Sequence, residues 1–245
     1  MPARACSFDF GQTLASIDTD LLVRKLGGIG IAVSGELAEA SLAGAWSVYD
    51  AAIQAGQGGH PWKVFMRALL ESSTLTERDD PPSPEALSRA VDWLWSEQPI
   101  QNLWRKPIPG MLELCAELRT RGVPYGVLSN SEGRLRELIA EMGCTHLFDI
   151  VADSGCLGIE KPDPRIFEWI GTELAEELSA IVHVGDSLGA DIEGALAVGM
   201  RAIWFSPRDG AGRADPSQVS DPARVRICRD ADEVRAALID FGIPL

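Results

Sequence analysis

Basic residues and long apolar runs are both scarce in this chain of 245 residues. Its 22 lysines and arginines stand against 36 aspartates and glutamates, and the net charge of −14 disfavours binding to nucleic acids and anionic membranes. Charged residues interrupt the most apolar stretches well before the roughly 18 residues that a membrane-spanning helix needs. The first residues also lack the apolar core of a secretory signal. We therefore expect a cytoplasmic protein that binds neither nucleic acid nor membranes.

Cysteine and histidine motifs are missing as well. The five cysteines are odd in number, widely scattered, and show no Cys-x-x-Cys spacing. The three histidines likewise lack the spacing of metal ligands. We interpret the cysteines as buried, reduced thiols. His183 lies in an apolar run, and we interpret it as a structural residue of a strand rather than a catalytic base.

The apolar pattern changes along the chain. A short apolar segment, 5–8, predicts a strand that ends in a turn. From residue 18 to about 98, apolar residues recur near i, i+3 and i+4, which predicts helices. After the turn at 107–110, helices alternate with short apolar runs. The predicted elements there are helices 111–121, 133–142, 164–174, 190–198 and 231–241, and strands 124–128, 149–151, 180–184, 201–205 and 224–228.

This alternation predicts an α/β fold, namely a Rossmann-like parallel sheet with helices on both faces. We expect residues 1–16 and 101–245 to form this core, and residues 17–100 to form an inserted α-helical domain. In such a sheet, ligands bind outside the carboxyl ends of the strands. The residues that follow the predicted strands are therefore candidates for a functional site.

Polar residues that suit phosphate and metal chemistry follow several of these strands. They are Asp9 and Thr13 after the first strand, Ser129 and Asn130 after 126–128, Asp186 and Asp191 after 180–184, and Lys161 before a helix. Three carboxylates suit a hard cation such as Mg²⁺, and a lysine can neutralise a phosphoryl group. No single residue of this set indicates a phosphate and metal site by itself, but the occurrence of all of them in this order does.

The same segments resemble the four motifs of the haloacid dehalogenase superfamily. Residues 8–14 resemble the first motif, DxDGTL, with departures; 127–130 resemble the second, 161–167 the third, and 184–187 with Asp191 the fourth. The resemblance covers nearly the whole chain, and residues 17 to about 100 resemble the helical cap that follows the first motif in this family. It implies a phosphatase-like hydrolase with that cap.

The resemblance also implies roles for the residues that handle phosphate. Asp9 would be the nucleophile that accepts a phosphoryl group, and Ser129 and Lys161 would hold that group. The resemblance implies that Thr13 is a catalytic residue and that Asn130 helps to bind the phosphate. We therefore expect transfer of a phosphoryl group from a small phosphorylated metabolite, by a monomer or a homodimer.

The metal site implied by the resemblance holds Mg²⁺ with Asp9, Asp186, Asp191 and the backbone carbonyl of Gly11. Gly11 is also the main departure from the family pattern, because the phosphatases carry a second Asp there that serves as acid and base. Glycine keeps the carbonyl but loses this group, whose assistance is typically worth about 10²- to 10⁴-fold. The next residue, Gln12, can form hydrogen bonds but cannot titrate.

Two other functions stay open at this point. Gly11 is compatible with a non-catalytic or regulatory relative that binds a phosphorylated ligand without turnover. A dehalogenase-type hydrolase would use Asp9 to attack carbon without a metal, and the presence of Asp186 argues against it. A phosphatase would need a substitute acid from the substrate or the cap, where the candidates are His60, Asp50 and Asp20.

Overall fold

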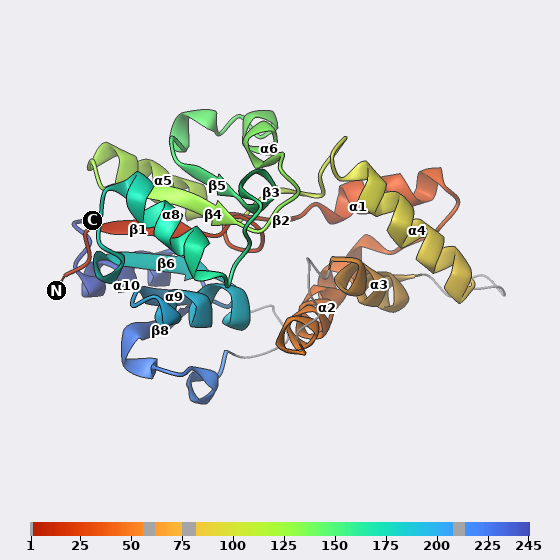
Figure 1. Cartoon of the computed structure of the whole chain (residues 1–245). Helices are drawn as coiled ribbons and strands as arrows, with labels where there is room; N and C mark the ends of the chain where they lie inside the picture. The colour runs from red at the N-terminus through yellow and green to blue at the C-terminus, as the bar shows by residue number, and fades with distance from the viewer. Residues whose placement is uncertain (1, 56–61, 75–81, 208–213) are drawn as a thin grey trace. The chain divides into compact units, whose positions relative to one another are not determined.

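The computed structural model of the chain describes residues 2–55, 62–74, 82–207 and 214–245 (Figure 1). These residues form two compact units. The core unit contains residues 2–16, 105–207 and 214–245, and the cap unit contains residues 17–104. Across the described ranges, we find no helix with the length and apolarity needed to cross a membrane.

Six parallel strands form the sheet of the core unit, in the order β5-β4-β1-β6-β7-β8. The strands are β1 (Ala5–Phe8), β4 (Tyr125–Ser129), β5 (Val151–Asp153), β6 (Ile181–Gly185), β7 (Arg201–Phe205) and β8 (Val225–Cys228). Every residue of β1, β4 and β6 is buried, as expected for parallel strands covered on both faces. The chain adds β4 and β5 on one side of β1 and β6 to β8 on the other, so the strand order switches at β1.

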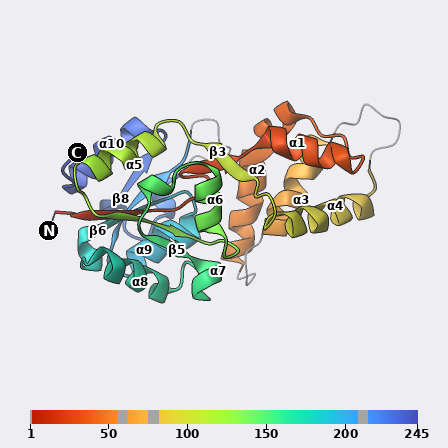
Figure 2. The same ribbon diagram turned by 90° about the horizontal axis from the view of Figure 1, so that it is seen from above.

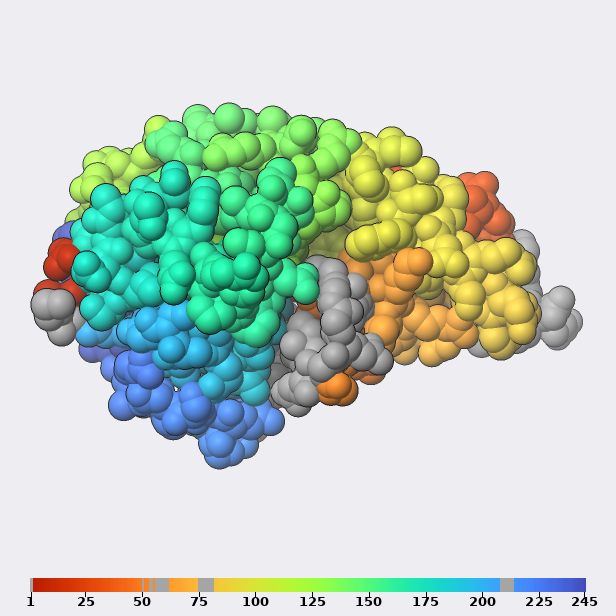
Figure 3. Space-filling view, viewed as in Figure 1, coloured from red at the N-terminus to blue at the C-terminus, as the bar shows by residue number. Residues whose placement is uncertain are grey.

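Helices cover both faces of this sheet (Figure 2). On one face lie α5 (Met111–Thr120) and α10 (Ala231–Phe241), and on the other lie α8 (Pro164–Leu174) and α9 (Gly194–Ala197). Two shorter helices, α6 (Leu135–Glu141) and α7 (Ser154–Leu157), follow β4 and β5. The outer residues of α8 form part of the exposed surface of the core unit (Figure 3). The predicted α/β fold is thereby confirmed.

One predicted helix is wrong in its start and its type. The pattern of residues 190–198 predicts a regular helix, but the chain forms a π-helical turn at Leu188–Glu193 before the short α9. The N–H groups of Asp191 and Ile192 both donate to the carbonyl of Ser187, at 3.0 and 3.2 Å. A wider turn of this kind often occurs at functional sites, and here it contains Asp191.

The described residues of the cap unit form four helices, inserted between two short paired strands, β2 (Ala15–Ile17) and β3 (Trp104–Pro107). The helices are α1 (Thr19–Gly28), α2 (Gly35–Gln54), α3 (Trp62–Ser73) and α4 (Pro84–Glu97). The ring of Trp104 lies 6.3 Å from Trp46 and 6.0 Å from Phe65, so aromatic side chains form much of the interior of this unit. The predicted helical insertion is confirmed.

Candidate active site

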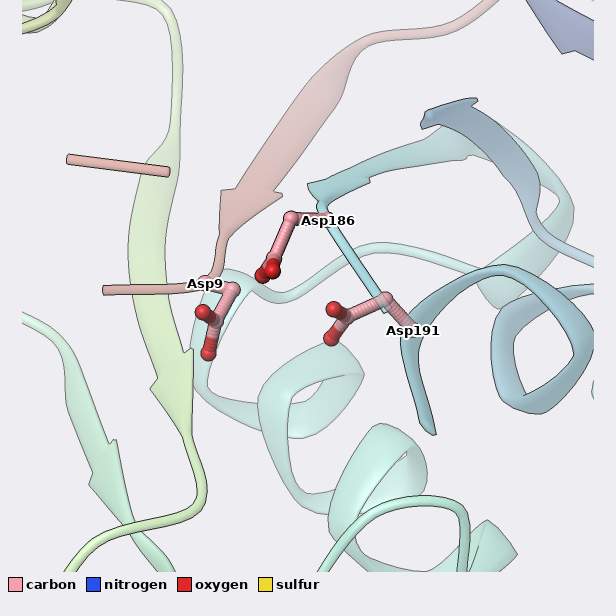
Figure 4. A group of neighbouring side chains, drawn as sticks. All are labelled: Asp9, Asp186 and Asp191. Atoms are coloured by element: carbon pink, nitrogen blue, oxygen red, sulfur yellow. The ribbon is translucent and has the colours of Figure 1, made fainter. Parts of the chain in front are cut away.

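Three aspartates meet at the carboxyl edge of the sheet, where the strand order switches. Asp9 directly follows β1, and its N–H donates to the carbonyl of Val184 at 2.8 Å. Asp186 follows β6, and Asp191 lies in the π-helical turn. Each of these three side chains offers a carboxylate oxygen within 4.8 Å of the others, and Figure 4 shows the side chains turned toward one another. Asp9 and Asp191 are 7% and 1% exposed.

Lys161 lies between two of these carboxylates. Its Nζ is 2.6 Å from Asp9 Oδ1 and 2.6 Å from Asp191 Oδ1, and its side chain is buried. Asn130 holds the backbone of this lysine on both sides: its Oδ1 accepts from the Lys161 N–H at 2.8 Å, and its Nδ2 donates to the Lys161 carbonyl at 3.0 Å. The polar groups of Asn130 therefore place Lys161 in this structure.

Burial and charge act against each other within this group. Burial raises the pKa of Asp9, although Lys161 opposes the shift. Burial alone would also raise the pKa of Asp191, but Lys161 and His183 hold it well below its usual range. Burial would lower the pKa of Lys161, but the carboxylates of Asp191 and Asp9 outweigh it and raise the value. Lys161 therefore supplies a fixed positive charge rather than a proton at neutral pH.

The donor set fits a divalent cation. Three carboxylates and one ammonium carry a formal charge of −2, which a divalent ion would balance. Oxygen ligands suit Mg²⁺, which commonly binds through one or two carboxylates and keeps several waters. The oxygens of Asp191 already accept hydrogen bonds from the Ser187 N–H at 2.9 Å, from Lys161 and from His183. Asp9, Asp186 and Asp191 are therefore the candidate ligands, and a direct bond from Asp191 to the ion would compete with these hydrogen bonds.

The turn after Asp9 leaves two polar atoms unsatisfied. The N–H groups of Leu14 and Ala15 both donate to the Phe10 carbonyl, at 2.9 Å each. Within this turn, Gln12 has a left-handed backbone with φ of 56°. Gln12 Nε2 and Thr13 Oγ1 are buried and have no hydrogen-bond partner. An unpaired buried group typically costs about 1–3 kcal/mol, so this turn is suited to a ligand that supplies the partners.

Ser129 ends β4 and is 4% exposed. The loop that follows it is held by Asp153, which the sequence analysis did not identify. The Asp153 carboxylate accepts hydrogen bonds from Ser131 Oγ at 2.6 Å, the Gly133 N–H at 3.0 Å and the Leu135 N–H at 2.9 Å. An acidic residue at the end of a short buried strand is the signal that could have identified it.

Two further contacts to the aspartates were not predicted. His183 lies in β6 as expected, but its Nε2 is 3.0 Å from Asp191 Oδ1. Trp204 Nε1 donates to the backbone carbonyl of Asp186 at 2.9 Å. A histidine inside a buried apolar strand needs hydrogen-bond partners, and this was the available signal.

The structure leaves the candidate acids of the cap untested. Asp20 lies in the first turn of α1 with an exposed side chain. His60 and the side chain of Asp50 lie outside the described residues. The substitute acid and base therefore stays a prediction.

A family model and curated relatives point to one protein family for this chain, and a solved structure shares its fold. The family model of the haloacid dehalogenase-like hydrolases matches residues 3–199. Phosphoserine phosphatase of Thermus thermophilus is 28% identical over 199 residues, which is 79% of this chain and 74% of that protein. Haloacid dehalogenase-like hydrolase domain-containing protein 3 of Mus musculus is 32% identical over 135 residues. The match covers 54% of this chain and about half, 53%, of the length of the mouse protein. The magnesium-bound HAD hydrolase YfnB of Bacillus subtilis has the same fold, with a TM-score of 0.67 over 97% of this chain and 99% of that one at 18% identity.

Proposed function

The chain belongs to the haloacid dehalogenase-like hydrolases, and from this premise we propose that it is a Mg²⁺-dependent phosphatase of a small phosphorylated metabolite. The observation that carries the proposal is the buried pair of Asp9 and Lys161, 2.6 Å apart within the group of three aspartates. A carboxylate nucleophile beside a fixed positive charge suits transfer of an anionic phosphoryl group. The phosphoserine phosphatase relative supports a small phosphorylated substrate.

In the proposed reaction, a carboxylate oxygen of Asp9 attacks phosphorus, and the bond between phosphorus and the leaving oxygen breaks. Water then attacks the aspartyl phosphate, which restores the carboxylate and releases inorganic phosphate. Lys161 lies within reach of Asp9 and would neutralise charge on the transferring group. Asp9, Asp186, Asp191 and the Gly11 carbonyl would hold Mg²⁺, which when bound would offset negative charge on the phosphoryl group.

The turn after Asp9, residues 10–14, holds no acidic side chain that could protonate the leaving oxygen. Gly11 has no side chain, and the amide of Gln12 can donate a hydrogen bond but no proton. Lys161 keeps its proton because two carboxylates surround it. Leaving groups that depart as stable anions should therefore react fastest. Gly11 also favours a second candidate function, a relative that binds a phosphorylated ligand without turnover.

Rapid mixing with p-nitrophenyl phosphate and Mg²⁺ tests this proposal, because nitrophenolate needs little protonation to leave. We expect a burst of nitrophenolate equal to the enzyme concentration, followed by slower turnover. Asp9→Asn should lose both phases, whereas Asp149→Asn, at an exposed position of the core unit, should keep them. Nitrophenolate release that survives in Asp9→Asn would contradict the proposal.

Two other outcomes would identify the alternatives. Tight binding of inorganic phosphate without any turnover would favour the binding function. Halide release from a haloacid that persists in a chelator would identify carbon-centred hydrolysis instead.

A further inference from the structure

A buried chain of hydrogen bonds leads from the sheet to the nucleophile. Ser7 and His183 are register partners on the neighbouring strands β1 and β6, and both are 0% exposed. Ser7 Oγ lies 2.8 Å from His183 Nδ1, and His183 Nε2 lies 3.0 Å from Asp191 Oδ1. The same oxygen of Asp191 accepts from Lys161 Nζ, which also donates to Asp9. The proposed reaction uses neither Ser7 nor His183 directly.

The ring of His183 is fixed from three sides. A carboxylate can only accept, so Nε2 must carry the hydrogen that faces Asp191. On the opposite edge, the hydroxyl of Ser7 lies at Nδ1. The ring of Phe167 from α8 contacts the imidazole edge-on, with centroids 5.6 Å apart and planes at 90°. These contacts leave the Nε2–H directed at Asp191.

This hydrogen bond affects where the charge of Lys161 lies. Asp191 is buried more deeply than Asp9, so its carboxylate has the greater need for donors. If the Nε2–H of His183 were removed, Asp191 Oδ1 would lose one of the two side-chain donors described for it and keep Lys161 Nζ. The ammonium of Lys161 would then be drawn toward Asp191 and away from Asp9.

We propose that His183 is a positioning residue, which acts through Asp191 to keep Lys161 at the nucleophile Asp9. This inference rests on the proposed function, since it assigns His183 to the phosphorylation of Asp9. The loss of a residue that orients groups around a metal site typically costs about 10- to 100-fold in activity or metal affinity.

A pair of amide substitutions tests the inference. In His183→Asn the amide reaches only the place of Nδ1, whereas in His183→Gln its nitrogen reaches the place of Nε2 and can donate to Asp191. We expect His183→Asn to lower the burst rate with p-nitrophenyl phosphate and the Mg²⁺ affinity by about 10- to 100-fold. His183→Gln should recover most of both. His146→Asn makes the same change at an exposed histidine of the core unit and should leave both at the wild-type level.

Thermal unfolding and calorimetric titration with Mg²⁺ separate positioning from a general loss of structure. Equal burst rates in His183→Asn and His183→Gln would overturn the inference, whether both match the wild type or both are impaired. If the His183 variants do not fold, Ser7→Ala carries the test, because it keeps the ring but removes its Nδ1 partner. It should slow the burst several-fold without unfolding, and an unchanged burst rate would overturn the inference.

Measurements on the wild-type protein distinguish a failure of the proposed function from a failure of the role proposed for His183. A wild type that releases no nitrophenolate and binds no Mg²⁺ would overturn the proposed function, and this inference with it. A wild type that shows the burst, together with a fully active His183→Asn, would overturn the role of His183 alone.

Discussion

Gly185 ends β6 where the side chain of Asp191 needs room, which makes Gly185→Ala a direct test of the packing at the site. A Cβ at Gly185 would lie 2.3 Å from Asp191 Cγ and 2.5 Å from Asp191 Oδ2, whereas ordinary contacts begin at 3.4 Å. The carboxylate would therefore have to move about 1 Å, the difference between the first and last of these distances. Such a movement would stretch its hydrogen bonds to Lys161 and His183.

The expected loss of stability combines two terms. An extra methyl group in a packed interior typically costs about 1–3 kcal/mol, and a lost hydrogen bond to a charged group costs about 1.5–3 kcal/mol. We therefore expect the free energy of unfolding to fall by about 2.5–6 kcal/mol in Gly185→Ala, which lowers the unfolding temperature by at least about 5 °C in a protein of this size. Urea titration followed by circular dichroism measures the first quantity, and calorimetry should show weaker binding of Mg²⁺.

Gly44→Ala is the matched control. Gly44 lies inside α2, and a Cβ built there meets nothing within 4 Å. The same substitution in a helix interior should leave stability unchanged or raise it by roughly 0.5–1 kcal/mol. A Gly185→Ala variant with wild-type stability and wild-type Mg²⁺ affinity would show that the Asp191 carboxylate does not need the space at Gly185.

Three further predictions concern other parts of the core unit. Of the five cysteines only Cys156 is exposed, so Ellman's reagent should modify one thiol rapidly in the native protein and none in Cys156→Ser. Hydrogen bonds from Arg235 lower the pKa of Glu117 to about 2, so this pair should stabilise the fold fully at neutral pH and progressively less as the pH falls from about 4.5 toward 2. The difference in unfolding temperature between wild type and Glu117→Gln should shrink over that range, and a constant difference would contradict the shift. Asp153→Ala would leave three backbone N–H groups without their acceptor, at about 1–3 kcal/mol each, so urea titration should show a loss of at least about 3 kcal/mol.

The fold could be predicted in detail where the local pattern decides the structure. The helix Pro164–Leu174 begins directly after Asp163, whose side chain accepts from the Arg165 N–H, and it has the predicted bounds. The strand Arg201–Phe205 also has its predicted bounds, because the apolar run that follows Arg201 is typical of a buried parallel strand. In both cases the signal lies within neighbouring residues.

The π-helical turn could not be predicted, because hydrophobic spacing does not report which carbonyl accepts a given N–H. Two N–H groups share the carbonyl of Ser187, and this sharing shifts the register of the turn around Asp191. The prediction of a regular helix from residue 190 was therefore wrong at this point.

The candidate site could be predicted as a set of residues but not as a network. The position of Asp9, Asp186 and Asp191 after strands suffices to bring them to one edge of the sheet, and the structure places them within 4.8 Å. The contact between Ser7 and His183 requires that β1 and β6 be neighbours in this register. Strand order is a property of the whole fold, and a single sequence does not report it locally.

Phosphorylation of Asp9 is tested by trapping the aspartyl phosphate itself. The protein would be mixed with p-nitrophenyl phosphate and Mg²⁺, quenched in acid within the burst, digested, and analysed by mass spectrometry. We expect one added phosphoryl group on the peptide that contains Asp9, and none when Asp9→Asn is treated in the same way. An unmodified Asp9 peptide during a full burst, or a phosphoryl group on a different residue, would contradict it.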